Sequence, residues 1–210
     1  MKKILAMLLC ILSACATNNE IKREYYENGN LKMETPYNNG VMNGIKKLYN
    51  KDGVLIMETL YKEGSIVGMK VYYKNGNLLS DMPFKDYKED GIEKQYYENG
   101  KLQKEIYYEK GIEIWQKEYD EDGNLIKDKK YYDTGDIWIE GFYENGKLVS
   151  GNFYVPKGQL VSTTFFDENK KKTKMIMYDK DGTPLSETGY KDGEEIYKKK
   201  YDEKGNFIKE

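Results

Sequence analysis

Of the 210 residues, 33% are charged, 14% aromatic and only 39% hydrophobic, which excludes a large globular core, while 21 tyrosines are too many for a disordered chain. The 34 basic and 36 acidic residues leave a formal net charge of -2, so no broad positive field exists to attract nucleic acid. Histidine is absent and both cysteines precede residue 16, which excludes disulfides, thiol nucleophiles, imidazole bases and the usual zinc sites from the rest of the chain.

The first fifteen residues, MKKILAMLLCILSAC, are typical of an export signal. Two lysines precede the apolar run at residues 4–12, which is too short to span a bilayer. The run ends in LSAC, which resembles the bacterial lipoprotein signal, where cleavage precedes a cysteine that carries lipid. An ordinary signal peptide that contains a cysteine is the alternative. We therefore expect a signal peptide at residues 1–14 and a lipidated Cys15, followed by a tether to residue 24.

The same signal predicts where the protein resides. Several acyl chains on Cys15 would hold the protein firmly on a membrane. Ala16 stands where an aspartate would resemble the inner-membrane retention signal. We expect an exported lipoprotein of the cell envelope, on the outer membrane if the cell is Gram-negative.

From residue 25 onward the chain repeats, and glycines mark the turns. The glycines taken as structural turn residues are Gly29, Gly40, Gly53, Gly64, Gly76, Gly100, Gly111, Gly123, Gly146, Gly182 and Gly205. Gly29, Gly53 and Gly76 are 24 and 23 residues apart, and further turns fall between them. Tyr87 occupies a glycine position, which predicts a distorted hairpin. Asn169 occupies another, where asparagine is the best substitute for a left-handed conformation.

The segments between turns alternate and predict strands. Tyrosine recurs three or four residues before each turn glycine, as at Tyr26 and Tyr49, and short runs rich in Leu and Ile follow the glycines. We therefore predict an all-β fold at residues 25–210. It would be an elongated, twisted antiparallel sheet of tandem β-hairpins, with about eight repeats of about 23 residues and a length of about 75 Å. The pattern weakens between Phe165 and Met177, where we expect irregular repeats.

The repeated words resemble a known family. YYENGKL, at residues 96–102, is followed by Tyr-x-x-Gly ending at Gly111, eleven residues after the first glycine. This unit is similar to the bacterial MORN-repeat variant, and the similarity extends over nearly all of the chain after the signal. The resemblance implies an elongated β structure made of repeats. Many members of that family carry an antitoxin label, so the resemblance also implies an antitoxin-like role.

No residue set predicts catalysis, a cofactor or a metal site. Acidic clusters such as DED at residues 120–122 recur at turns, which favours solvated loop residues over a unique acid-base pair. The same loop lacks the spaced ligands and terminal glutamate of a calcium loop. Trp115 and Trp138 are possible ligand aromatics, for example for sugars, although packing within the sheet explains them as well.

These observations predict a non-enzymatic, lipid-anchored envelope protein that presents a repeat β platform to a protein partner. Its contact with the membrane would be through the lipid, and we expect no nucleic acid and no cofactor. Two alternatives remain open. One is an immunity-like protein that neutralises a cognate toxin, and the other binds an envelope polymer through exposed aromatics.

Overall fold

The computed structural model describes residues 18–208, in which every regular element is a β-strand. The strands are β1 (Asn19–Tyr25), β2 (Leu31–Asn38), β3 (Val41–Met42), β4 (Gly44–Tyr49), β5 (Leu55–Lys62), β6 (Ser65–Tyr72), β7 (Leu78–Lys85), β8 (Lys88–Glu89), β9 (Gly91–Tyr96), β10 (Leu102–Glu109), β11 (Ile112–Tyr119), β12 (Leu125–Tyr131), β13 (Ile137–Glu144), β14 (Lys147–Val155), β15 (Gln159–Phe166), β16 (Lys172–Tyr178), β17 (Pro184–Lys191), β18 (Glu194–Tyr201) and β19 (Phe207–Ile208). No helix in this part of the chain has the length and hydrophobicity needed to span a membrane.

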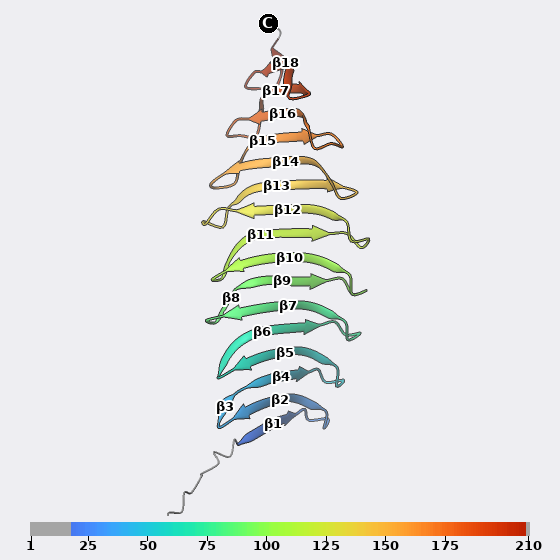
Figure 1. Ribbon diagram of the computed structural model, residues 1–210, viewed down its shortest axis with the longest axis vertical. Helices are drawn as coiled ribbons and strands as arrows, with labels where there is room; N and C mark the ends of the chain where they lie inside the picture. The colour runs from blue at the N-terminus through green and yellow to red at the C-terminus, as the bar shows by residue number, and fades with distance from the viewer. Residues whose placement is uncertain (1–17, 209–210) are drawn as a thin grey trace, which may run out of the picture.

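The strands form one open antiparallel sheet in which neighbours in sequence are neighbours in space. Figure 1 shows them stacked like rungs across the long axis, from β1 near one end to β18 near the other. Each pairing is antiparallel, from β1 with β2 to β18 with β19. The predicted all-β fold of tandem hairpins is therefore confirmed. Among residues 18–208 the sheet is a single layer, and no second sheet or helix covers either face.

Five-residue loops and two-residue turns connect most of the strands, and a three-residue turn at residues 156–158 joins β14 to β15. In the first loop, the Tyr26 amide donates to the Asn30 carbonyl at 2.8 Å and the Gly29 amide donates to the Tyr26 carbonyl at 2.9 Å. Gly29 needs its φ of 86° to close this loop. The loops at residues 50–54, 73–77, 97–101 and 120–124 are closed in the same way. Two-residue turns join the strands between these loops, for example at Asn39 and Gly40.

At the five-residue loops, the first loop residue explains the two tyrosine spacings. Where it is tyrosine, the hydroxyl donates to the backbone one repeat later, as from Tyr26 to the Tyr49 carbonyl at 2.7 Å and from Tyr73 to the Tyr96 carbonyl at 2.8 Å. Where it is Asn or Asp, the side chain closes its own loop, as Asn50 Oδ1 does by accepting from two amides. Tyrosine four residues before the glycine of such a loop is then the last residue of the preceding strand, as Tyr49 is in β4.

Two prolines interrupt the hydrogen bonds between strands at equivalent positions of two repeats. Pro36 and Pro83 have no amide hydrogen to donate, and the strands opposite them break before Gly44 and Gly91, which have φ values of 111° and 112°. The Asp90 amide donates to the Pro83 carbonyl at 3.2 Å at this break. The expected distortion is therefore present near Tyr87, but the prediction assigned it to the wrong residue. The same break occurs beside Gly40, where the turn does contain glycine.

Tyr87 and the segment around Asn169 differ from what the sequence predicted. Tyr87 adopts a φ of 62° in a closed two-residue turn between the paired residues Lys85 and Lys88. In the loop at residues 167–171, Lys170 rather than Asn169 takes the glycine position, with a φ of 61°. The predicted irregularity between Phe165 and Met177 is also wrong. A five-residue loop connects β15 to β16, and the two strands pair with a bulge next to the loop, as other strand pairs do.

The N-terminal boundary of the sheet also needs a correction. The sequence predicts a tether up to residue 24, yet residues 19–24 lie in β1, where Arg23 pairs with Glu34. Polar strands without alternation of hydrophobic residues carry little sequence signal, and β1 is exposed along its whole length. The predicted signal peptide and Cys15 lie outside the described residues, as do residues 209–210.

Glycine at the two non-glycine turn positions is expected to stabilise the sheet. Tyr87→Gly and Lys170→Gly should each raise the free energy of unfolding by about 1 kcal/mol, because a residue with a Cβ is disfavoured at positive φ. Denaturant titration of each variant measures the change. A loss of stability in both variants would contradict the assignment of strain to these positions.

Burial is confined to a narrow strip along the middle of the strands. Ile106 is the buried hydrophobic residue of the described chain, with 6% exposure. The buried polar and charged residues are Thr35, Thr59, Glu93, Gln116, Glu140 and Thr188, and Gly141 and Gly189 are buried as well. A one-layer sheet buries a side chain only under its neighbours in adjacent strands, so stability accumulates from repeat to repeat.

Candidate interaction face

A row of directly paired charged residues crosses the first two thirds of the sheet. Pairing continues residue by residue from β1 to β12, and the sign of the charge alternates at every step. The row, here called the charge ladder, consists of Arg23, Glu34, Lys47, Glu58, Lys70, Asp81, Lys94, Glu105, Lys117 and Asp128. Directly paired residues point to the same side of a sheet, so these ten side chains share one face, here called the ladder face.

Ion pairs within the ladder are exposed or half-buried and individually weak. Arg23 Nε lies 2.8 Å from Glu34 Oε1, and Lys70 Nζ lies 3.4 Å from Asp81 Oδ2. The Lys70 and Asp81 side chains are 47% and 43% exposed. Such pairs contribute about 0.2 to 1 kcal/mol each, so stability alone does not account for the order of the row.

Tyrosine hydroxyls hold several ladder carboxylates from the adjacent strand. Tyr72 donates to Glu58 at 2.6 Å, and Tyr119 donates to Glu105 at 2.9 Å. Burial, the hydrogen bond and the charge of Glu105 raise the pKa of Tyr119 to about 12, so this hydroxyl stays protonated at neutral pH. The carboxylates are thereby oriented before any partner arrives.

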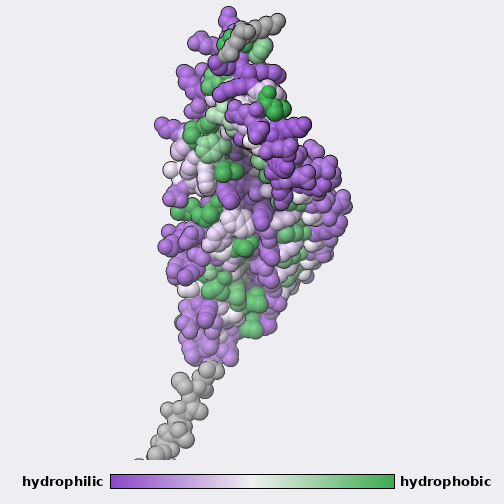
Figure 2. All heavy atoms as spheres, turned by 45° about the horizontal axis from the view of Figure 1, so that its top comes forward, coloured by the Kyte–Doolittle hydropathy of each residue, from purple (hydrophilic) through white to green (hydrophobic). Residues whose placement is uncertain are grey.

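An apolar row runs beside the ladder on the same face. Each member lies two positions from a ladder residue, which places it on the ladder face. The apolar row consists of Ile21, Pro36, Ile45, Leu60, Gly68, Pro83, Ile92, Tyr107 and Trp115. Ile21, Ile45, Leu60 and Ile92 are each more than 40% exposed. Figure 2 shows that hydrophobic side chains reach the surface in an interrupted column among hydrophilic ones.

Gly68 creates a hollow in the apolar row. It pairs with Leu60 on one side and Pro83 on the other, and it has no side chain to fill the space between them. The hollow has a volume of about 360 Å³ and is also lined by Ile45 and by the ladder residue Lys70. A Cβ on Gly68 would meet no atom closer than 3.8 Å. The hollow can receive a small apolar group, and charged side chains of the ladder lie at the rim of the hollow.

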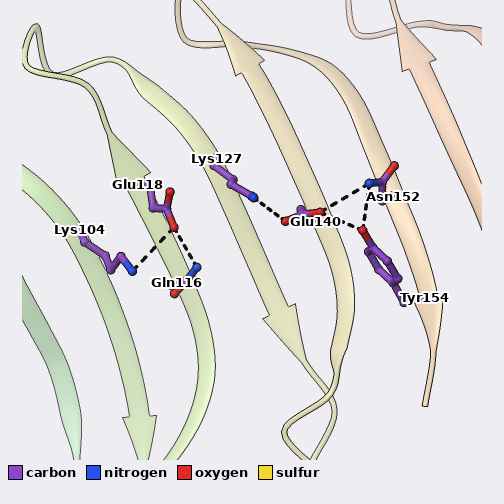
Figure 3. Close-up of polar contacts among 7 residues, drawn as sticks. All are labelled: Lys104, Gln116, Glu118, Lys127, Glu140, Asn152 and Tyr154. Atoms are coloured by element: carbon purple, nitrogen blue, oxygen red, sulfur yellow. Dashed lines mark hydrogen bonds and ion pairs between the residues drawn. The ribbon is translucent and has the colours of Figure 1, made fainter. Parts of the chain in front are cut away.

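The opposite face carries a closed polar network around Glu140 (Figure 3). Glu140 precedes Gly141, which pairs with Asp128, so its side chain points away from the ladder face. Lys127 Nζ lies 2.7 Å from Glu140 Oε1, and the Tyr154 hydroxyl donates to Oε2 at 3.0 Å. The Glu140 side chain is only 9% exposed. Its burial raises the pKa, but the hydrogen bonds from Lys127 and Tyr154 outweigh burial and lower the pKa below 4.5.

This network predicts a pH-dependent stability difference. Glu140→Gln should lower the free energy of unfolding by about 2 kcal/mol at pH 7, because the bonds to a carboxylate are lost. A lowered folded pKa stabilises the protein above the unfolded pKa, and this contribution disappears as pH falls through the folded value. The difference between wild type and variant should therefore shrink below pH 4.5 in denaturant titrations. A difference independent of pH would contradict the assigned role of the charge.

The two predicted ligand aromatics belong to separate ring pairs. Trp115 lies in β11, with its ring centroid 5.8 Å from that of Tyr107 and the Lys117 ammonium 5.3 Å from its centroid. Trp138 lies in β13 and pairs with Tyr132 at 6.0 Å, with 39% exposure. Trp115 is therefore part of the ladder face, and the structure shows no ring contact between the two tryptophans.

The turn glycines predicted from the sequence lie in the connections between strands. They do not form a chemical site. All eleven predicted turn glycines have positive φ values, between 73° and 87°. In the acidic loop at residues 120–124, Asp120 Oδ1 accepts from the amides of Asp122 and Asn124, and the hydrogen bonds from Asn124 lower the pKa of Asp120. Within residues 18–208 no group of three or more acidic, His or Cys residues is placed to hold a metal.

Sequence reasoning missed the ladder, although a signal for it exists. Successive ladder residues are 11 to 13 positions apart, which is the spacing of the turns, and their charges alternate. A scan for charge at the turn period would have found Glu58, Lys70 and Asp81. Their placement on one face also requires the strand register.

A match to a family model agrees with the repeat architecture. Residues 21–39, 69–86, 89–110 and 129–145 match the family model described as MORN repeat variant. No curated protein matches the chain. Among solved structures, the crystal structure of TarM has 11% identity over 54% of this chain and 20% of that chain, with a TM-score of 0.32.

Two other solved structures show similarly low agreement. A porin-like protein from Bacteroides uniformis has 12% identity over 84% of this chain and 92% of that chain, with a TM-score of 0.24. The accessory secretory protein 1, 2 and 3 structure from Streptococcus pneumoniae has 13% identity over 59% and 19%, with a TM-score of 0.20. The chain thus spans about a fifth of the length of TarM and of the Streptococcus protein.

Proposed function

The chain is built of MORN repeat variants, and we propose that it is a non-enzymatic, lipid-anchored envelope protein whose ladder face binds another protein. The observation that carries the proposal is the pairing of two rows on one open face. The charge ladder supplies ordered groups of both signs, and the apolar row supplies exposed Ile45, Leu60 and Ile92. Charged and apolar rows side by side provide both the specificity and the burial that a protein interface needs.

The polar groups of this face favour binding over catalysis. The ladder carboxylates for which contacts are observed already accept from tyrosine hydroxyls or pair with lysine or arginine. Catalytic acids and bases instead need a desolvated and distinctive setting. The repeated setting of Glu58 and Glu105, each bonded to a tyrosine of the next strand, is the mark of a structural repeat.

Anchoring through Cys15 would place the sheet next to the membrane. Four residue steps separate Cys15 from Asn19, the first residue of β1, and an extended chain covers about 14 Å in four steps. The N-terminal end of the sheet would then stand at the lipid headgroups. The charged, fully exposed β1 suits that position.

Anchoring is tested by replacing the cysteine. Cys15→Ala should move the protein from the membrane fraction to the aqueous fraction and abolish incorporation of labelled palmitate. Wild-type protein is the control. Unchanged membrane retention without lipid incorporation would contradict the anchor, and binding by the sheet could still be assessed separately.

Binding is tested by crosslinked capture from native envelope with tagged residues 16–210. The ladder-face variant Leu60→Asp/Ile92→Asp should lose a stoichiometric protein that wild type retains. Leu185→Asp/Ile196→Asp is the matched control, because these residues of β17 and β18 are 47% and 59% exposed and lie beyond the ladder. Equal capture by both variants, or no protein captured by wild type, would refute the proposed face. A captured toxin would identify the immunity-like alternative.

A further inference from the structure

Building on the proposed function, we propose that the partner of the ladder face is a second copy of this chain. The two copies pack face to face in reversed order. Their two-fold axis runs parallel to the strands, between Lys70 and Asp81. Charge complementarity, the apolar row and the available area each support this arrangement.

The charge ladder is complementary to itself when it is reversed. It has ten members, five basic and five acidic, in strict alternation. A row with an even number of alternating members presents opposite charges at every position to its own reversed copy. The facing pairs are Arg23 with Asp128, Glu34 with Lys117, Lys47 with Glu105, Glu58 with Lys94, and Lys70 with Asp81. A shift by one strand would oppose like charges along the whole row, so the charges also select the register.

The apolar row fits the same symmetry. Gly68 is the partner of Pro83 in the pairing between β6 and β7, so the axis passes between these two residues as it passes between Lys70 and Asp81. In the dimer, Pro83 of the second copy would therefore face the hollow at Gly68, which has a volume of about 360 Å³. Leu60 would face Ile92 of the second copy in the same way. These two residues are 44% and 43% exposed in the single chain.

The area is sufficient for a specific dimer. Ten strands about 4.8 Å apart extend over about 43 Å, and six residues of a strand extend over about 20 Å. The face thus offers roughly 850 Å² per copy, close to the 800 Å² per partner that is standard for stable protein interfaces.

A partner of one predominant charge would gain little binding energy from the ladder, because the charges of the ladder sum to zero.

Sedimentation of residues 16–210 tests the oligomeric state, since this segment contains every described strand. We expect a concentration-dependent dimer that dissociates more readily in high salt. Glu58→Lys/Asp81→Lys should weaken the dimer at least tenfold, because it opposes lysine with Lys94 and Lys70 of the second copy. Glu27→Lys/Glu63→Lys changes the net charge equally at exposed loop and turn positions and should leave the dimer intact. A monomer at all concentrations would overturn the inference.

Thiol crosslinking tests the reversed order, because residues 16–210 contain no cysteine. Lys47→Cys mixed with Glu105→Cys should form a covalent dimer with a bismaleimide that spans about 10 Å, since these positions face each other and packed sheets lie about 10 Å apart. Neither variant should crosslink with itself, because identical positions would lie at least about 24 Å apart, five strand spacings, which is beyond the reach of this reagent. Efficient self-crosslinking would refute the reversed register. If the chain is monomeric but ladder-face variants still lose a captured protein, this inference fails and the proposed function stands.

Discussion

Gly91→Ala is expected to lower the free energy of unfolding by about 3 kcal/mol. Gly91 has a φ of 112°, outside the small left-handed region that other residues tolerate, and a Cβ there would lie 3.0 Å from Pro83 Cγ. Neither the glycine nor the rigid proline ring can move without breaking the pairing of β7 with β9. Denaturant titration measures the loss.

The matched control for this prediction is Gly68→Ala. Gly68 has ordinary strand geometry, and its nearest contact, the Met82 carbonyl oxygen, would be 3.8 Å from a new Cβ. The free energy of unfolding of the Gly68→Ala variant should stay within about 0.5 kcal/mol of wild type or rise slightly, because alanine loses less conformational freedom on folding than glycine. Equal losses for the two variants would show that the break at Pro83 does not depend on the glycine conformation.

Ile106→Ala is expected to cost about 2 to 3 kcal/mol. Ile106 is 6% exposed and lies between its paired neighbours Glu93 and Gln116, which are also buried. Removing three carbons leaves a gap that a one-layer sheet can close only by shifting adjacent strands. The expected loss of stability lies in the lower half of the range that is usual for Ile→Ala, because solvent can reach the gap. The midpoint of chemical denaturation reports the effect.

Ile92→Ala provides the comparison within the neighbouring strand. Ile92 is 43% exposed on the ladder face and lies next to Glu93 in β9. Its replacement should cost less than about 1 kcal/mol, since little apolar area returns to water. If both variants lost the same stability, the buried strip would not be the source of the sheet's cohesion.

Much of the fold could be predicted because the turns have strict local requirements. Glycine at positive φ and tyrosine at fixed spacing mark nearly every connection, and antiparallel pairing follows from short connections. Lys170 could not be predicted, since only the closed loop shows which of two adjacent polar residues takes the left-handed position. Strand β1 could not be predicted because its sequence, NEIKREY, has no alternation of apolar and polar residues. The strand is instead held in an extended conformation by its pairing with β2.

The candidate site was harder to predict than the fold, for a geometric reason. The spacing of Glu34, Lys47 and Glu58 is visible in the sequence, but it varies between 13 and 11 residues. Placing them on one face requires the register and every bulge, and a slip by one residue would move a side chain to the opposite face. Trp115 illustrates the same limit, because its place in the apolar row depends on pairing with Tyr107.

Lysine labelling in native envelope tests the central claim, that a protein covers the ladder face. Intact envelope and purified monomer would be treated briefly with an acylating reagent, and modification at each lysine would be measured by mass spectrometry. We predict that Lys47, Lys70 and Lys94 are protected in the envelope, whereas the exposed loop residues Lys51 and Lys74 are labelled equally in both samples. Equal labelling of ladder and loop lysines in the envelope would contradict a covered ladder face.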